Sequence, residues 1–221
     1  MIFKMENYES IDKVKFISVT GASGSGKSTF ARKLCDSINS YWGIGTASVI
    51  SEDEYYKCLK DLEPVQVGSY NFDNPLSIEH DKLLSDLEQL EKKLSIKINE
   101  YCFSSHSKLD TFKYIDPTKI VIVEGLFLLT NEHLKTKFSL NIFIDTPIDI
   151  CLLRRIERDL KARGRDIQSI SNQYRHTVRN ALFEFILPTR QEADVRIDTS
   201  KSHNNIVRLL TSSILTDAFV S

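Results

Sequence analysis

Two hydrophobic patterns alternate along the chain. Short, nearly continuous apolar runs rich in β-branched residues predict strands, and longer stretches with apolar residues at helical spacing predict helices. The predicted strands cover residues 14–20, 47–51, 120–124, 140–145 and 193–197. The predicted helices cover residues 27–41, 77–93, 148–163, 167–187 and 204–216. Apolar strands that alternate with helices predict an α/β fold, a parallel sheet with helices on both faces.

Local signals place some boundaries and one insertion. Ser77 is expected to be the N-cap of the helix over 77–93, and Pro147 suits the first turn of the next predicted helix. The stretch 94–114 breaks the alternation of strands and helices, and its spaced apolar residues predict a β-hairpin insertion over the sheet. No second domain is visible, so residues 1–221 are predicted to form one domain.

Composition excludes several classes of protein. The 29 Lys and Arg residues against 30 Asp and Glu residues give a net charge of −1. The chain therefore lacks the excess positive charge typical of nucleic-acid binding. No apolar run reaches the roughly 20 residues of a membrane helix, and residues 1–13 lack the apolar core of a signal peptide. The cysteines form no CxxC pair, which argues against zinc and fits a reducing compartment. We therefore expect a cytoplasmic protein that binds neither nucleic acid nor membrane.

A glycine-rich segment carries the strongest chemical signal. Residues 21–28, GASGSGKS, match the pattern GxxxxGK[ST] between a predicted strand and a predicted helix. The glycines let backbone N–H groups point at phosphate oxygens, and the helix N-terminus adds partial positive charge. Lys27 can reach the β- and γ-phosphates, and the Ser28 hydroxyl can bind Mg²⁺. The predicted ATP-binding residues of this loop are Gly21, Ala22, Ser23, Gly24, Ser25, Gly26, Lys27, Ser28 and Thr29.

The phosphate loop alone does not separate a kinase from a GTPase or an ATP-driven motor. The GTPase motifs DxxG and NKxD are absent from the sequence, and the chain is short for a motor with further modules. A small-molecule kinase remains, and other residues have to identify its acceptor.

Two carboxylates lie where predicted strands end. Asp53 follows the second strand and Glu124 ends the third, and parallel sheets bind ligands beyond the carboxyl ends of their strands. Asp53 can take the proton of an acceptor hydroxyl and help to hold Mg²⁺, and Glu124 can anchor Mg²⁺. Glu52 and Glu54 compete with Asp53 for this role. A solvated acidic turn or a helix cap is the alternative for these acids.

A basic run follows the fourth predicted strand. Residues 154–165 hold six basic and two acidic residues, a local charge of +4 (6 − 2). Arg155 and Arg158 share one helical face, and planar guanidinium groups suit phosphate oxygens. The segment of approximately residues 154–168 therefore predicts a helical lid over a triphosphate. A solvated basic helix and an RNA-binding patch are the alternatives.

Helical or strand periodicity does not explain one aromatic set, Tyr56, Phe72, Tyr101 and His106. Aromatic rings can sandwich a flat base while His106 or Asp73 reads its polar edges. Packing in the core or exposure on the surface is the alternative for each residue.

Together these motifs resemble the uridine kinase (uridine/cytidine kinase) family of P-loop NTPases. The resemblance runs from residue 16 to about 194 and rests on GASGSGKST, SEDEYYK, NFDNP, EYCFSSHS, VIVEGL, DTPIDICLLRRIERDLKARGRD and NQYRHTV…FILPTRQEAD. It implies transfer of the γ-phosphoryl group of ATP or GTP, with Mg²⁺, to the 5′-hydroxyl of uridine or cytidine in pyrimidine salvage. The implied fold is a three-layer parallel sheet flanked by helices, with a small β-hairpin and a helical lid. The family commonly assembles as a homotetramer.

The resemblance also implies roles for single residues. Asp53 matches the general base, and Arg158 and Arg163 match lid arginines that contact phosphate. Catalysis would then rest on Asp53, Lys27 and Arg158, and the metal would be bound by Ser28, Glu124 and Asp53. The implied nucleoside-binding residues are Tyr56, Phe72, Asp73, Tyr101, His106, Arg155, Arg165 and Gln173.

Within the nucleoside-binding set, the resemblance implies that Asp73 holds the ribose hydroxyls while Tyr101 and His106 address the pyrimidine. Two other hypotheses stay open. One is a P-loop kinase for another small alcohol, such as a sugar phosphate, pantothenate or nicotinamide riboside. The other is a nucleotide-binding sensor without turnover.

Overall fold

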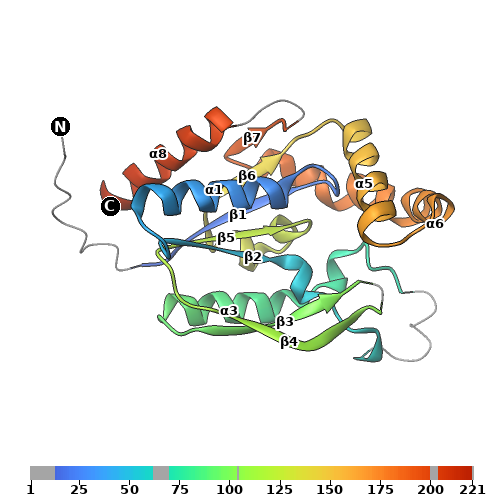
Figure 1. Ribbon diagram of the computed structural model, residues 1–221, viewed down its shortest axis with the longest axis horizontal. Coiled ribbons are helices and arrows are strands. Elements are labelled where there is room, and N and C mark those ends of the chain that lie inside the picture. The colour runs from blue at the N-terminus through green and yellow to red at the C-terminus, as the bar shows by residue number, and fades with distance from the viewer. Residues whose placement is uncertain (1–12, 62–69, 104, 200–203, 221) are drawn as a thin grey trace.

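A parallel sheet forms the centre of the molecule (Figure 1). The computed structural model describes residues 13–61, 70–103, 105–199 and 204–220. The strands, which are all parallel and lie in the order β2-β5-β1-β6-β7, are β1 (Lys15–Gly21), β2 (Ala47–Ser51), β5 (Ile120–Gly125), β6 (Phe138–Ile144) and β7 (Val195–Ile197). These strands confirm the five predicted from apolar runs. Residues 1–12, where the sequence shows no signal core, lie outside the described residues.

Helices cover both faces of this sheet, and two more lie beyond the ends of its strands (Figure 1). One face carries α1 (Lys27–Trp42) and α8 (Asn204–Val220), and the other carries α3 (His80–Glu91). The strands point toward α5 (Ile148–Ala162) and α6 (Ile167–Gln173). The predicted α/β fold is therefore confirmed, and the predicted lid segment 154–168 lies at the carboxyl ends of the strands.

Short helical turns connect these elements. Besides the α-helices α4 (Glu132–Lys135) and α7 (Arg179–Ala181), the chain forms several single turns of other helix types. The 3₁₀ turns are η1 (Glu52–Tyr55), η2 (Leu59–Asp61), η3 (Pro75–Ser77), η4 (Leu128–Thr130) and η7 (Pro188–Glu192). The π-helical turns are η5 (Tyr174–Val178) and η6 (Leu182–Ile186).

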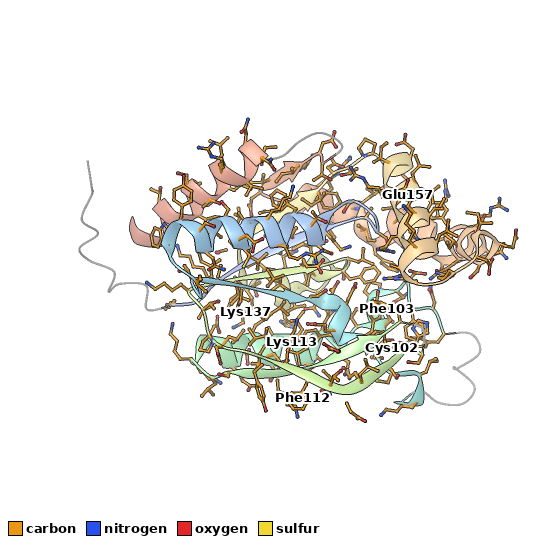
Figure 2. The ribbon with its side chains drawn as sticks, in the orientation of Figure 1. Cys102, Phe103, Phe112, Lys113, Lys137 and Glu157 are labelled. Carbon is orange, nitrogen blue, oxygen red and sulfur yellow. The ribbon has the colours of Figure 1, made fainter. Side chains whose placement is uncertain are left out.

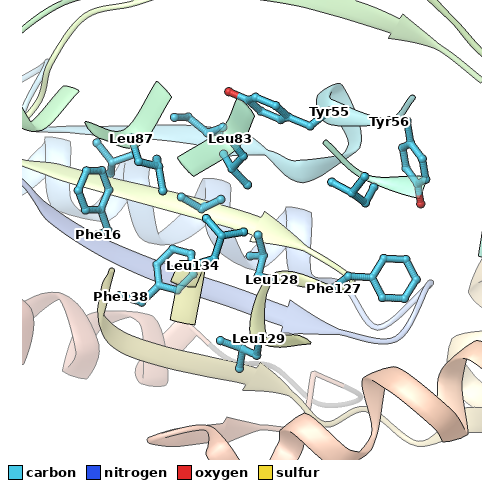
Figure 3. Close-up of a cluster of buried hydrophobic side chains, with 14 of the residues drawn as sticks. Phe16, Tyr55, Tyr56, Leu83, Leu87, Phe127, Leu128, Leu129, Leu134 and Phe138 are labelled. Carbon is cyan, nitrogen blue, oxygen red and sulfur yellow. The ribbon is translucent and has the colours of Figure 1, made fainter. Parts of the chain in front are cut away.

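The core has two parts because the central strands are buried on both faces. In β5, Ile120 and Ile122 pack toward α1 and α8, while Val121 and Val123 pack toward α3. This alternation explains why the strand reads as an uninterrupted apolar run. Figure 3 shows the part of the core on the α3 side of the sheet. There Leu83 and Leu87 of α3 lie near Phe16 of β1 and near Leu128, Leu129 and Leu134 of η4 and α4.

A separate antiparallel hairpin covers the lower edge of the α3 face in Figure 1. Its strands are β3 (Ile96–Cys102) and β4 (Ser107–Ile115), which confirms the insertion predicted over 94–114. Ile96 and Ile98 are buried, whereas Lys97 between them is exposed. The hairpin therefore packs one face against the core and turns the other to solvent.

The predicted start of the helix over 77–93 is wrong. Ser77 is the last residue of η3, and its hydroxyl donates to the carbonyl oxygens of Phe72 (2.9 Å) and Asn74 (2.5 Å). The side chain of Asn74 accepts from the backbone N–H of Leu76 and so caps this earlier turn. Because Pro75 and the Asn74 cap fix a separate turn first, α3 begins only at His80.

The helix predicted over 167–187 is right in extent but wrong in regularity. The chain is helical from α6 through η6, yet two of its turns are π-helical. In η5 the Thr177 hydroxyl shares its one hydrogen between the carbonyl oxygen of Gln173 (3.0 Å) and Oδ2 of Asp73 (2.6 Å), and the N–H of Arg179 bonds to the carbonyl of Tyr174. A hydroxyl that occupies the carbonyl four residues earlier displaces the usual backbone bond, which gives a physical reason for the wider turn.

The cysteines behave as small apolar residues. Cys35, Cys58 and Cys151 are buried, and none of these three forms a disulfide. Of the helices in the described ranges, none combines the length and the apolar character that crossing a membrane requires.

Candidate active site

One large cavity lies at the carboxyl ends of the strands. Its volume of about 770 Å³ is in the usual range for a small-molecule site. Its polar lining residues include Ser23, Lys27, Asp53, Asp73, His106, Arg155, Arg158, Arg163, Arg165 and Gln173. Its other lining residues include Tyr56, Phe72, Tyr101, Cys102, Phe103, Leu109, Leu126 and Ala162. The structure thus brings together every residue of the predicted nucleoside-binding set.

The phosphate loop joins β1 to α1 at one end of this cavity. Gly24 has a φ of +84°, and a Cβ atom there would stand 2.2 Å from the carbonyl oxygen of Cys151. Only glycine therefore lets the loop pack this closely against α5. The N-terminus of α1 has no side-chain cap, so its backbone N–H groups suit an anion. Lys27 is buried and lines the cavity, whereas Thr29 is exposed on the first turn of α1.

Three oxygen-bearing side chains meet where β2 and β5 end beside α1. The Ser28 hydroxyl donates to Oε2 of Glu124 at 2.9 Å, and the Ser51 hydroxyl donates to Oε1 of Glu124 at 2.7 Å. These hard oxygen donors fit Mg²⁺, which proteins typically bind through one or two carboxylates while substrate phosphates and water supply the other ligands. The described residues contain no group of three or more His, Cys, Asp or Glu side chains placed to hold a metal ion.

The acids on either side of Asp53 are engaged by other groups. Glu52 is buried, with Oε1 2.8 Å from Nε2 of His80, and its Oε2 accepts the backbone N–H of Phe127 at 2.8 Å. Glu54 forms an ion pair at 2.7 Å with Lys113, which projects from β4 of the hairpin (Figure 2). Neither side chain lines the cavity.

Asp53 is the member of this acidic cluster that lines the cavity. Its carboxylate forms no hydrogen bond or ion pair with another described residue. Burial raises the pKa of Asp53 to about 6, while Lys27 opposes the rise and Glu124 adds to it. The carboxylate is therefore ionised at neutral pH but more basic than an exposed aspartate, as a general base requires.

Aromatic rings form another wall of the cavity. Phe72 stacks on His106 with ring centroids 3.9 Å apart and planes 13° apart. The rings of Tyr56 and Tyr101 lie 5.5 Å apart. Burial lowers the pKa of His106, and the nearby Arg165 lowers it further. The imidazole is therefore neutral at physiological pH and offers one donor and one acceptor nitrogen.

A hydrogen-bond network joins the phosphate loop to the far side of the cavity. Oδ2 of Asp73 accepts from Nε2 of Gln173 at 3.0 Å and from the Thr177 hydroxyl at 2.6 Å. Oε1 of Gln173 accepts from Nη2 of Arg155 at 3.0 Å, and Nη1 of Arg155 donates to the Ser23 hydroxyl at 2.9 Å. Asp73 is thereby oriented through a continuous set of contacts that starts at the phosphate loop.

The other predicted lid arginines lie around the same end of the cavity. Nη2 of Arg158 lies 3.5 Å from the Ser23 hydroxyl. The guanidinium of Arg163 lies 4.3 Å from the ring centroid of Phe103, which follows β3 (Figure 2). Arg165 donates to the Gln173 side chain, so the basic segment contacts the phosphate loop, the hairpin and the acceptor side together.

Several residues of the site are missing from the sequence analysis. Thr177 lies four positions after Gln173, a spacing that places both on one side of a helix and could have indicated a shared partner. Ser51 is the last residue of β2, so its position at a strand end was a usable signal. Asp159 appeared only as an acid in a basic run, although it lies four positions after Arg155.

Comparison with known proteins agrees with this geometry. The model of the "Phosphoribulokinase / Uridine kinase family" matches residues 16–205. The uridine kinase of Mannheimia succiniciproducens is 37% identical over 199 residues, which cover 90% of this chain and 92% of that protein. The uridine kinase of Haemophilus influenzae (strain PittGG) is 36% identical and aligns with 90% of this chain and 93% of its own length.

A solved structure supports the fold independently. The D-glycerate 3-kinase from Cryptococcus neoformans superposes with a TM-score of 0.56 at 14% identity. The match covers 80% of this chain and 82% of that protein. At this identity the likeness concerns the fold alone.

Proposed function

Because the chain belongs to the phosphoribulokinase / uridine kinase family, we propose that this kinase transfers the γ-phosphoryl group of ATP or GTP to the 5′-hydroxyl of uridine or cytidine. One observation carries the proposal. A single cavity is lined by Lys27 of the phosphate loop, by the basic carboxylate of Asp53, and by Asp73 with its aromatic neighbours. Such a cavity suits a phosphate donor and a flat, hydroxylated acceptor side by side.

Asp53 accepts the proton of the attacking hydroxyl in this proposal. Its raised pKa and its lack of a hydrogen-bond partner among the described residues leave the carboxylate available to an incoming hydroxyl. Glu52 and Glu54 are held by other groups and do not compete for the proton.

The donor phosphates lie in the loop of residues 21–28 in this proposal. Backbone N–H groups at the start of α1 and the Lys27 ammonium bind the phosphate oxygens. Arg158 and Arg163 line the same cavity and stabilise the charge that spreads over the transferred group.

Ser28, Glu124 and Asp53 would hold Mg²⁺ at this site. Their oxygen atoms match the ligands that Mg²⁺ prefers. When bound, the ion offsets negative charge on the phosphate oxygens.

In this proposal the acceptor side of the cavity binds the nucleoside. Asp73 accepts hydrogen bonds from the ribose hydroxyls, and Gln173 fixes the orientation of its carboxylate. Tyr101 and the neutral His106 address the polar edge of a pyrimidine, whose flat ring packs against Phe72 or Tyr56. Arg155 and Arg165 complete this wall.

A coupled assay of ADP release tests the proposal directly. The protein is incubated with Mg²⁺, ATP and one acceptor at a time: uridine, cytidine, a purine nucleoside, nicotinamide riboside, pantothenate or a sugar phosphate. We expect turnover with uridine or cytidine, and none for the variant Lys27→Ala. A folded protein that turns over another acceptor in preference contradicts the proposal for the pyrimidine. If none of these acceptors supports ADP release by the folded protein, the proposed kinase reaction itself is contradicted.

We also propose a cytoplasmic homotetramer that binds neither nucleic acid nor membrane. These properties rest on the family resemblance, on the net charge of −1 and on the absence of a membrane-spanning helix in the described ranges. Size-exclusion chromatography with light scattering measures the assembly, and a monomer would contradict it.

A further inference from the structure

Asp159 is a fully buried acid at the centre of the lid arginines. Its side chain, on the fourth turn of α5, is 0% exposed. Oδ1 of Asp159 lies 2.8 Å from Nη2 of Arg158, accepts from Nε of Arg158 at 2.9 Å, and lies 3.6 Å from Nη1 of Arg163. Oδ2 lies 3.6 Å from Nε of Arg155 and 3.8 Å from Nη1 of Arg165. One carboxylate therefore faces four guanidinium groups, and all four line the cavity.

The chain is arranged around this carboxylate. Arg155 and Arg163 lie four positions before and after Asp159, so both project from the same side of α5 or its end. Gly164, with a φ of +60°, turns the chain after α5, and the backbone N–H of Arg165 donates to the carbonyl of Asp159 at 3.2 Å. This turn brings the fourth guanidinium back to the carboxylate.

Asp159 compensates only part of the surrounding charge. Four guanidinium groups and one carboxylate have a net charge of +3 (4 − 1). Neither Oδ2 of Asp159 nor Nε of Arg155 has a hydrogen-bond partner among the described residues. Burial, together with like charges such as Arg158, lowers the pKa of Arg155 and Arg163. A cluster with this excess positive charge suits a polyanion in the cavity.

We propose that Asp159 is a positioning residue that gathers the four lid arginines into one phosphate-binding cluster without touching the substrate. The proposal rests on the proposed function, in which these arginines face the nucleoside triphosphate and its acceptor. Without the carboxylate the guanidinium groups repel one another and lose their common anchor. Their geometry, and with it the stabilisation of the transferred phosphoryl group, is then lost.

The sign of the effect separates this role from simple electrostatics. By Coulomb's law alone, removing a negative charge beside a polyphosphate site strengthens ATP binding and lowers KM. A positioning role has the opposite consequence, because scattered arginines bind the polyphosphate less well. A role in packing alone lowers Tm but changes neither binding nor turnover.

Three variants test the proposal. Asp159→Asn keeps the shape and removes the charge, and Asp159→Glu keeps the charge. Glu157→Gln is the matched control, because Glu157 is an exposed acid on the same helix (Figure 2). For each variant we measure kcat and KM for ATP, and the rise in Tm on adding inorganic tripolyphosphate. The thermal measurement needs no acceptor, so it tests Asp159 even where the proposed nucleoside reaction fails in the wild type.

We expect Asp159→Asn to lower kcat/KM for ATP by about tenfold or more. We also expect its tripolyphosphate-induced rise in Tm to be about half of the wild-type rise or less. Asp159→Glu should have a higher kcat/KM for ATP and a larger tripolyphosphate-induced rise in Tm than Asp159→Asn. Glu157→Gln should match the wild type in both. A lower KM for ATP or a larger thermal shift in Asp159→Asn overturns the proposal, as do wild-type values. If Asp159→Asn does not fold, Asp159→Glu decides. A folded Asp159→Glu that retains turnover and the rise in Tm supports the proposal, and one that lacks both overturns it.

Discussion

The phosphate loop and the acceptor wall of the same cavity are assembled differently. The loop takes its residues from one continuous segment, 21–28, between β1 and α1. The acceptor wall takes its residues from segments far apart in the chain: Gln173 and Thr177, which orient Asp73, follow it by 100 and 104 positions. A local signature describes the first region, whereas the second exists only once the whole chain has folded.

The phosphate loop and the acceptor wall should respond differently to substitutions. The loop depends on backbone N–H groups and on glycine conformations that its own sequence provides. The acceptor wall depends on side chains that hold one another, from Ser23 through Arg155 and Gln173 to Asp73. A substitution in the wall therefore acts on positions remote in sequence. Arg155 contacts the phosphate loop directly, whereas Thr177 contacts only the acceptor end of the network, so a change at Thr177 is expected to affect nucleoside binding and not ATP binding.

The largest expected effect comes from Asp53, where the two regions meet. Asp53→Asn should lower kcat by about 10²- to 10⁴-fold, because the amide cannot accept the proton of the acceptor hydroxyl. KM for ATP should stay within a few-fold of wild type, since the phosphate loop is untouched and Ser28 and Glu124 remain to hold Mg²⁺. Steady-state kinetics with the matched control Asp36→Asn, at an exposed acid on α1, measures this. Retained turnover would exclude Asp53 as the base.

The same variant should be more stable than the wild type above pH 6. The pKa of Asp53 is about 6 in the folded protein against 3.8 for an ordinary aspartate, so the folded state binds more protons between these pH values. Stability contributed by this group therefore falls as pH rises through the window. Asp53→Asn removes the buried charge, and we expect Tm at pH 8 to rise by about 2–4 °C, with a smaller change at pH 4. An unchanged Tm at pH 8 would contradict the burial of that charge.

A buried hydrogen bond joins Glu52, just after β2, to His80 at the start of α3. Glu52→Ala leaves His80 and the backbone N–H of Phe127 without their partner. We expect a loss of about 2–6 kcal/mol in the free energy of unfolding, because two buried polar groups each lose a hydrogen-bond partner at about 1–3 kcal/mol. Urea unfolding followed by circular dichroism measures this loss. The control Glu54→Gln, at a less buried ion pair, should cost much less, and equal losses would contradict this account.

The sequence allows prediction of the sheet and the phosphate loop because both leave local signals. Strands buried on two faces read as apolar runs, and the loop combines fixed residues with a strand and a helix on either side. The start of α3 at His80 was missed because the cap that matters is Asn74, in an earlier 3₁₀ turn. Sequence patterns do not show which of two nearby polar residues caps a turn.

The candidate site is harder to predict, because its contacts are not local. Family resemblance named the residues that line the cavity, but it did not name Thr177 and Asp159, which contact several of them. Thr177 acts through a π-helical turn that no periodic pattern indicates, and Asp159 resembles an ordinary solvated acid in a charged helix. Among three consecutive acids, only the tertiary partners His80 and Lys113 show why Asp53 is the one left facing the cavity.

The dependence of activity on pH should reflect Asp53. Its carboxylate is protonated as pH falls through about 6, so kcat/KM for the nucleoside should fall about tenfold for each pH unit below that value. Burial is the main cause of this raised pKa; Lys27 and Arg163 lower it, and Glu124 and Glu52 raise it. A pH profile of kcat/KM measures the dependence, and the residual rate of Asp53→Asn should lack this limb. A flat wild-type profile between pH 5 and 7 would contradict the assignment.

The smallest expected effect isolates the acceptor wall. Thr177→Val removes the hydroxyl that donates to Oδ2 of Asp73, while Gln173 still donates to the same oxygen. The loss of one of two such bonds, about 1 kcal/mol, should raise KM for the nucleoside about fivefold. KM for ATP should not change, because Arg155, and not Thr177, donates the hydrogen bond to the loop residue Ser23. Thr177→Ser, which keeps the hydroxyl, should restore the wild-type KM. A parallel rise in both KM values would show that the donor and acceptor sides respond as one unit, against the separation argued for them.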